Sequence, residues 1–192
     1  MLKRSLLVLS SVVSFSALSA WQLDTTASSL HFLSTKNAQV TEVHQFNELS
    51  GSVDKSGKLT VTVSLSSVNT GIAIRDTRMQ EMLFEVASFA DATFTATLPE
   101  NMVNVDKGAS IQGKVEGELM LHGTRAPASF DVVVSKLDDA TLQVSTVAPT
   151  LINAEDFGLK EGVQALKKVA GLKSISTTVP VTFSTQFTQS AD

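Results

Sequence analysis

Apolar and polar residues alternate along most of this 192-residue chain, and the alternation constrains the fold more than any other feature. Between Leu59 and Leu65, apolar residues take every second position, and Thr60, Thr62 and Ser64 take the others. A two-residue period is typical of a strand with one apolar and one polar face. Strand-like runs of this kind occur in eight segments, so the sequence predicts an all-β protein.

Short turns rich in Gly, Asp, Asn and Lys separate these segments, as at 54–57 and 106–108. Long antiparallel strands that meander tend to close into a barrel, because closure leaves no unpaired edge. We therefore expect an antiparallel β-barrel of about eight strands. The predicted strands lie within 30–33, 46–53, 59–65, 92–98, 111–121, 130–134, 142–146 and 175–187.

Two segments depart from the strand pattern. Residues 74–84 carry Met79, Met82 and Leu83 among charged neighbours, and residues 161–169 place apolar side chains on one helical face. Such spacing favours amphipathic helices. We expect two short helices that cover the ends of the barrel.

The N-terminus has the layout of a secretory signal peptide. Lys3 and Arg4 precede an uncharged stretch from 5 to 15, and small residues follow it. We expect cleavage after Ser19, with Ala20 as the next candidate and a retained membrane anchor as the weaker alternative. Removal of residues 1–19 leaves one domain, 20–192. The remaining 13 Lys and Arg residues stand against 19 acidic ones, a net charge of −6. The expected compartment is the periplasm.

Several classes of function lack support in the sequence. A net charge of −4 gives no basic footprint for nucleic acid. The absence of Cys excludes a disulfide framework and a Cys nucleophile. The three histidines, His31, His44 and His122, form no recognised metal motif, although His31 and His44 could form a two-His site across adjacent strands. Their spacing leads us to expect no metal. No Gly-x-Ser-x-Gly motif occurs, so a hydrolase of the common type lacks its signature, and we expect no enzyme.

An eight-stranded barrel is either filled by its own side chains or holds one small ligand. The alternation of side chains along each strand gives the candidate wall of such a cavity. Flexible Met side chains suit the mouth of the cavity, because they can adapt to a ligand with a kinked chain. The candidate wall consists of Phe32, Phe46, Val63, Phe94, Leu119, Leu121, Phe130, Val132 and Phe183, with Met79, Met82 and Phe84 at the mouth.

The chain carries several short motifs in a definite order. They consist of Trp21 to Asp24, Ser29, His31, Phe32, Val68 to Gly71, Arg75, Asp76, Met79, Phe84, Phe89, Phe94, Gly117 to Leu119, Leu121, Gly123 and Thr124. Taken together in their order and spacing, these motifs resemble the YceI-like family of secreted lipid-binding proteins. The resemblance begins in the opening strand and ends in a late strand and turn, so it spans nearly the whole mature chain. The sequence departs from the family pattern at Arg78, Leu83 and Ala90.

The resemblance implies a lipocalin-like barrel that holds an isoprenoid lipid, either a polyprenyl diphosphate or a molecule with a quinone-type tail. It implies no cofactor besides that lipid. It also suggests transport of the lipid, transient contact with a membrane, a role in stress response, and association as a homodimer.

Arg75 and Asp76 are the polar pair closest to the predicted mouth. A guanidinium offers two parallel donors, so Arg75 could bind a diphosphate or quinone head group. Alternatively, Arg75 pairs with a carboxylate or a backbone carbonyl to fix the loop, while Asp76 caps the helix.

Three hypotheses follow from the sequence. The leading one is a periplasmic carrier for an isoprenoid lipid. The alternatives are an enzyme acting on a lipid in the same cavity, which needs a buried polar group with a perturbed pKa, and a filled barrel with a structural or partner-binding role.

Overall fold

The computed structural model describes residues 19–190. The predicted signal peptide, 1–19, lies outside the described residues except for Ser19. Within the described part, no helix is both long and apolar enough to cross a membrane. All strands in this part belong to one antiparallel sheet.

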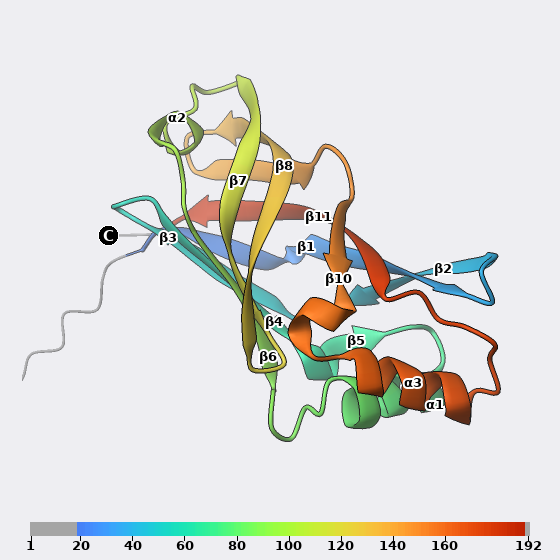
Figure 1. Ribbon diagram of the computed structural model, residues 1–192. Helices are drawn as coiled ribbons and strands as arrows, with labels where there is room; N and C mark the ends of the chain where they lie inside the picture. The colour runs from blue at the N-terminus through green and yellow to red at the C-terminus, as the bar shows by residue number, and fades with distance from the viewer. Residues whose placement is uncertain (1–18, 191–192) are drawn as a thin grey trace, which may run out of the picture.

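Eight strands form a closed ring, which confirms the predicted lipocalin-like barrel (Figure 1). They are, in order around the ring, β1 (Ser19–Lys36), β3 (Leu49–Asp54), β4 (Lys58–Ser64), β6 (Asp91–Thr97), β7 (Ser110–Leu121), β8 (Thr124–Asp138), β9 (Thr141–Thr146) and β11 (Thr178–Gln189). Pairing of β11 with β1 closes the ring, with Trp21 opposite Gln189 and Phe32 opposite Val181.

Three additional strands extend the wall beyond the ring: β2 (Val40–Phe46), β5 (Val68–Asn69) and β10 (Thr150–Asn153). The first part of β1 pairs with β3, and its second part, from Leu30 to Lys36, pairs with β2. In the same way, β11 pairs with β9 and then with β10. The two strands that close the ring are therefore longer than it is, and they carry the wall outward at one end.

A bulge separates the two parts of β1. Its pairing with β11 shifts register between Asp24 and Ser29, and the Asp24 carboxylate accepts hydrogen bonds from Thr26 and Ala27. A bulge bends a strand and increases its twist. The bend lies where β1 changes its partner from β3 to β2.

The predicted strand over 46–53 is wrong in one respect, because the chain forms two strands there. β2 ends at Phe46 and β3 begins at Leu49. Between them, the Asn47 amide donates to the Ser67 carbonyl, and the Glu48 amide donates to the Ser67 hydroxyl. These bonds to a neighbouring segment replace the strand pairing and break the ladder.

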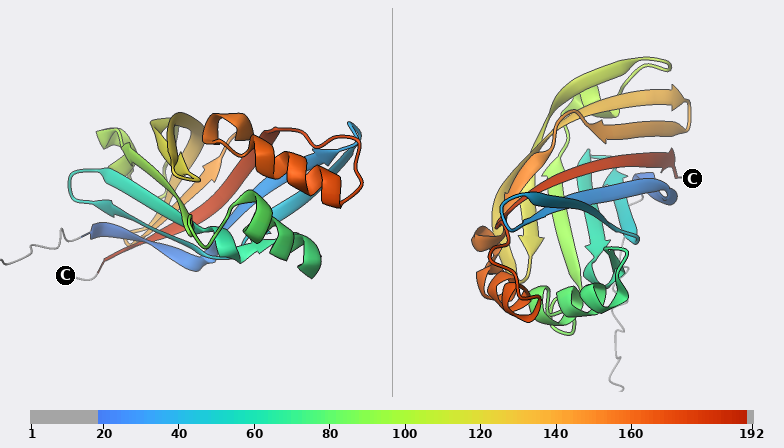
Figure 2. Two further views of the ribbon diagram at one scale, coloured as in Figure 1. Left: turned by 60° about the horizontal axis from the view of Figure 1, so that its bottom comes forward. Right: turned by 90° about the vertical axis from the view of Figure 1, so that its right-hand side faces the viewer.

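Helices lie at both ends of the barrel (Figure 2). At one end, α1 (Ala73–Arg78) runs into a π-helical turn, η2 (Met79–Leu83), and packs beside α3 (Lys160–Val169). These two segments match the predicted helices. The opposite end carries α2 (Glu100–Val103), which the sequence analysis missed, and two 3-10 turns complete the fold, η1 (Leu65–Ser67) and η3 (Ala154–Phe157).

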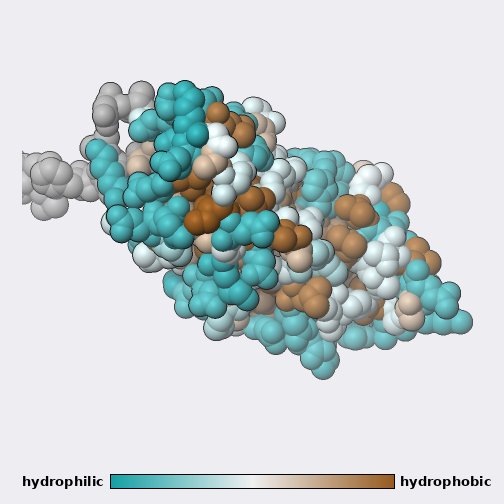
Figure 3. All heavy atoms as spheres, turned by 90° about the horizontal axis from the view of Figure 1, so that it is seen from above, coloured by the Kyte–Doolittle hydropathy of each residue, from teal (hydrophilic) through white to brown (hydrophobic). Residues whose placement is uncertain are grey.

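The buried apolar residues form two clusters along the barrel. One lies toward α2 and includes Trp21, Met102 and Phe130. The other lies under the α1 and α3 helices and includes Phe32 and Phe84. On the face seen in Figure 3, hydrophobic residues reach the surface in separate groups among hydrophilic ones.

The close approach of β6 and β7 gives a test of this packing. A Cβ at Gly117 would overlap the backbone oxygen of Thr95 and lie 2.6 Å from the Phe94 ring. Gly117→Ala should therefore lower the free energy of unfolding by about 1–3 kcal/mol, measured by urea titration. Gly113→Ala is the matched control on the same strand, because there the new methyl meets only the movable end of Met102. Equal losses for the two variants would contradict this account.

Candidate functional site

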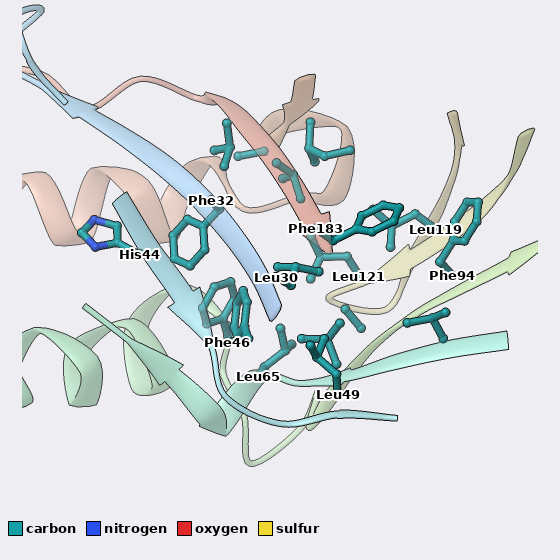
Figure 4. A pocket seen from close by; sticks show the side chains of 18 of the residues that line it. Leu30, Phe32, His44, Phe46, Leu49, Leu65, Phe94, Leu119, Leu121 and Phe183 are labelled. Atoms are coloured by element: carbon teal, nitrogen blue, oxygen red, sulfur yellow. The ribbon is translucent and has the colours of Figure 1, made fainter. Parts of the chain in front are cut away.

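The barrel encloses an apolar cavity of about 580 Å³. Trp21, Leu98 and Met102 line it toward α2, and Ile72, Ile74 and Val169 line it at the helical end. Figure 4 shows side chains from several strands pointing into the same space, among them Phe32, Phe46, Leu119 and Phe183. The cavity therefore runs along the barrel, and its size is within the usual range for small-molecule sites.

Most of the residues predicted from strand parity lie on this wall. On β4 and β6, for example, alternate residues line the cavity, and the intervening threonines do not. The predicted residues that line the cavity are Phe32, Phe46, Val63, Arg75, Met79, Phe84, Phe94, Leu119, Leu121, Phe130, Val132 and Phe183.

Aromatic rings form two groups along the wall. Phe130 contacts Phe94 and Phe183 with ring centroids 5.1 and 5.5 Å apart, in edge-on geometry. Nearer the helices, Phe46 contacts Phe32 at 5.2 Å and Phe84, the residue directly after η2, at 5.8 Å. Tilted and edge-on pairs are the preferred arrangements of aromatic rings, and they hold the rings in fixed positions along the cavity.

Met82 does not line the cavity, and Leu83 does so in its place. The reason is the π-helical turn, in which the Phe84 amide donates to the Met79 carbonyl five residues before it. A π turn is wider than an α turn, so the residue that follows Met79 on the same face comes four positions later. The prediction chose Met82 for the flexibility of its side chain, and the π turn leaves that side chain off the cavity wall.

Asp76 also lies off the cavity wall. Its carboxylate accepts hydrogen bonds from both the amide and the hydroxyl of Thr70, and α1 has no side-chain cap. Asp76 thus holds the loop before the helix, and it does not serve as the helix cap that one of the predictions assigned to it.

Arg75 bridges three segments of the chain. Its Nη1 donates to Glu42 Oε2 at 3.0 Å, and its Nη2 donates to the Thr70 carbonyl at 2.7 Å. Lys36 lies 2.6 Å from the same Glu42 oxygen. These contacts match the structural alternative for Arg75, because both terminal nitrogens are already bonded to protein atoms.

The polar part of the mouth includes residues that the sequence analysis missed. Lys36, Glu42, Ser34 and His44 line the cavity beside Arg75. Ser34 and Lys36 lie at the end of β1, and Glu42 and His44 lie on β2. β2 escaped prediction because it reverses the usual pattern: Glu42 and His44 face the cavity, and Val43 is exposed. Hydrogen bonds from Lys36 and Arg75 hold the pKa of Glu42 below its usual value, against the opposing effect of burial.

His44 is 3% exposed and packs its ring against Phe32 at a centroid distance of 5.2 Å. Burial, reinforced by the positive charge of Arg75, lowers the pKa of His44. Its Nε2 lies 2.9 Å from Ser34 Oγ, as in a nucleophile–base pair, but its Nδ1 has no hydrogen-bond partner. A Ser-His nucleophile depends on a group that orients the imidazole through that second nitrogen, and this pair lacks one.

The two-His metal site does not form. His31 is opposite Gln45 in the β1–β2 ladder, whereas His44 is opposite Phe32, so the two imidazoles are on different faces of the sheet. Among residues 19–190, no group of three His, Cys, Asp or Glu side chains could hold a metal ion.

The sequence model of the YceI-like domain matches residues 21–187, which is most of the chain. This protein belongs to the YceI-like family. A solved relative, a polyisoprenoid binding domain from Saccharophagus degradans implicated in plant cell wall breakdown, is 36% identical with a TM-score of 0.87. The match covers 90% of this chain and 100% of that one. Among curated proteins, none matches the chain.

Two more distant structures share the YceI-like fold. Burkholderia cenocepacia BcnA is 17% identical with a TM-score of 0.64, over 85% of this chain and 98% of that one. The Campylobacter jejuni YCEI protein is 21% identical with a TM-score of 0.60, over 82% of this chain and 91% of that one. The family and the relative at 36% identity point to a binding protein rather than an enzyme.

The first prediction from this YceI-like site concerns Arg75. Arg75→Ala removes the contacts to Glu42 and to the Thr70 carbonyl, and it should lower the free energy of unfolding by about 1–2 kcal/mol, because the side chain is partly exposed. Arg78→Ala is the control, since Arg78 lines the cavity but makes no ion pair within the described residues. An Arg75→Ala variant as stable as Arg78→Ala would show that the bridge contributes nothing.

The second prediction concerns the pH dependence of stability. The pKa of His44 is lower in the folded protein than the usual value of about 6.5, so the unfolded chain binds more protons as the pH falls below 6.5. The free energy of unfolding should therefore decrease as the pH is lowered from about 7.5 to the pKa that His44 has in the folded protein. Urea midpoints measured across this range should change less in His44→Gln.

An unchanged slope in His44→Gln would contradict the assignment. The contribution of Glu42 to the free energy of unfolding appears in a different pH range from that of His44. The pKa of Glu42 is lowered, so its contribution is lost only as the pH falls below about 4.3.

Proposed function

We propose that this protein is a periplasmic binding and carrier protein for an isoprenoid lipid, with the tail in the barrel and the head group at the helical end. The head group is a diphosphate or a quinone-type ring. The signal-peptide pattern of residues 1–19 supports the exported location.

The observation that carries the proposal is the apolar cavity along the barrel axis. An isoprene unit has five carbons, and burial of a methylene-sized group contributes about 0.8 kcal/mol. Two or three buried units thus correspond nominally to micromolar affinity relative to water. Against a bilayer the difference is far smaller, and the lipid can exchange in both directions.

The polar side chains are gathered at one end of the cavity, which gives the lipid a direction. Lys36, Arg75 and Arg78 line the helical end, whereas Trp21 and Met102 line the other. A polar head group buried among apolar residues would lose its hydrogen bonds to water. The tail therefore occupies the α2 end, and the head group stays at the helical end.

The relative from Saccharophagus degradans supports the ligand class, because its structure is described as a polyisoprenoid binding domain. The cavity weighs against a barrel filled by its own side chains. The missing orienting group at His44 weighs against a lipid hydrolase.

The decisive measurement is native mass spectrometry of the protein purified without detergent from the compartment to which it is exported. Solvent extraction then identifies any released lipid. We expect one added mass per chain that resolves to an isoprenoid. A bare polypeptide mass that is unchanged after incubation with polyprenyl diphosphates and with quinones would refute the proposal.

A variant pair ties the bound lipid to the cavity. Leu119→Trp places a larger side chain in the cavity and should abolish the added mass, since Leu119 lines it. Met120→Trp is the control, because Met120 is opposite Arg125 in the hairpin and is not a lining residue. Thermal unfolding checks that both variants fold. Retention of lipid by a folded Leu119→Trp protein would place the lipid elsewhere.

A further inference from the structure

Three aliphatic side chains at the helical end line the cavity and are also exposed to solvent. Ile72, Ile74 and Val169 line the cavity, yet they are 49%, 58% and 43% exposed. Ile72 and Ile74 are at the start of α1, and Val169 is at the end of α3. The apolar interior thus continues outward onto an exposed rim.

The rim is formed by three chain segments that meet at this end, 36–42, 72–78 and 166–175. The amide of Asn37 donates to the Ser174 carbonyl, which joins the first segment to the third. The start of α3 lies at the other end of the helix pair, where Gly162 packs against Leu83. The end of α3 is therefore on the same side as the start of α1, as Figure 2 shows.

The charge of the rim is opposite to that of the rest of the protein. The three rim segments carry six basic and two acidic side chains, whereas the other residues from 19 to 190 carry seven basic and sixteen acidic ones. Of the two acids, Glu42 is bonded to Lys36 and Arg75, and Asp76 is bonded to Thr70.

The remaining cations of the rim lie in the same chain segments as the exposed aliphatic residues. Lys167 and Lys168 occupy the last turn of α3, Lys173 follows it, and Arg78 is in the last turn of α1. No ion pair within residues 19–190 neutralises any of these four side chains. Basic residues around exposed apolar ones are typical of segments that lie on an anionic lipid surface.

We propose that this rim docks the protein onto an anionic lipid bilayer, with Ile72, Ile74 and Val169 directed into the membrane interface. The inference rests on the proposed function, since docking at the cavity mouth lets a lipid tail pass between bilayer and barrel without crossing water. The acidic remainder of the surface is repelled by the same bilayer, and the mouth therefore faces the membrane.

The test is co-sedimentation with unilamellar vesicles of phosphatidylcholine, with or without 30% phosphatidylglycerol. We expect binding only to the anionic vesicles, and less of it at high salt. A basic residue near an anionic surface contributes about a fivefold change in affinity, so a triple Lys167→Gln, Lys168→Gln and Lys173→Gln variant should bind about a hundredfold more weakly.

The matched control changes the charge equally at sites away from the rim, with Lys58→Gln, Lys107→Gln and Lys114→Gln. It should bind within about twofold of the wild type. Ile72→Ser with Ile74→Ser tests the apolar part and should bind more weakly without changing the salt dependence. Equal binding to both vesicle types, equal losses in the two triple variants, or no vesicle binding at all would overturn the proposal.

Mass spectrometry of the same preparations keeps the two proposals separate. A protein that carries lipid but binds no vesicle refutes docking and leaves the carrier function intact. A protein that binds anionic vesicles through the rim but carries no lipid refutes the carrier function alone. Self-association that Ile72→Ser with Ile74→Ser abolishes, with no vesicle binding, would assign the rim to a second copy of the chain.

Discussion

The barrel wall is a single β-sheet, so one face of each strand must be apolar toward the cavity and the other hydrophilic toward solvent. The rest of this structure depends on that constraint. Because strand side chains alternate between faces, each strand meets the constraint with one apolar and one polar set of residues. Thr60 and Thr62 on β4 are off the cavity wall, and Val61 and Val63 line it. The same strands therefore form an apolar interior and a hydrophilic outer surface.

The closed ring alone would form a short barrel, and two long strands extend the barrel and its cavity. β1 and β11 extend beyond the ring, and β2 and β10 continue the wall beside them. The bulge after Asp24 bends β1 where this extension starts. The extension carries Phe32 and Phe46 as well as Glu42, so it joins an aromatic section of the cavity to the polar section.

Alternation was enough to predict the barrel and most of the wall, because the two faces of a strand follow directly from the order of residues. It failed where another interaction replaced the local pattern. Leu83 takes the place of Met82 because a π turn alters the helical spacing, and β2 escaped prediction because it directs Glu42 and His44 inward. The bonds of Arg75 join segments 33 residues apart in the chain, a separation that no local pattern encodes.

The pairing of the first strand with the last also governs when the protein can fold. Trp21 meets Gln189, so the ring cannot close until almost the whole chain is available. Contacts this distant in sequence form slowly, since a long loop must close before they contribute. Until its last strand is available, the chain leaves β1 and β9 without β11, the strand that joins them. The same closure that creates the cavity therefore makes the barrel depend on the last residues of the chain.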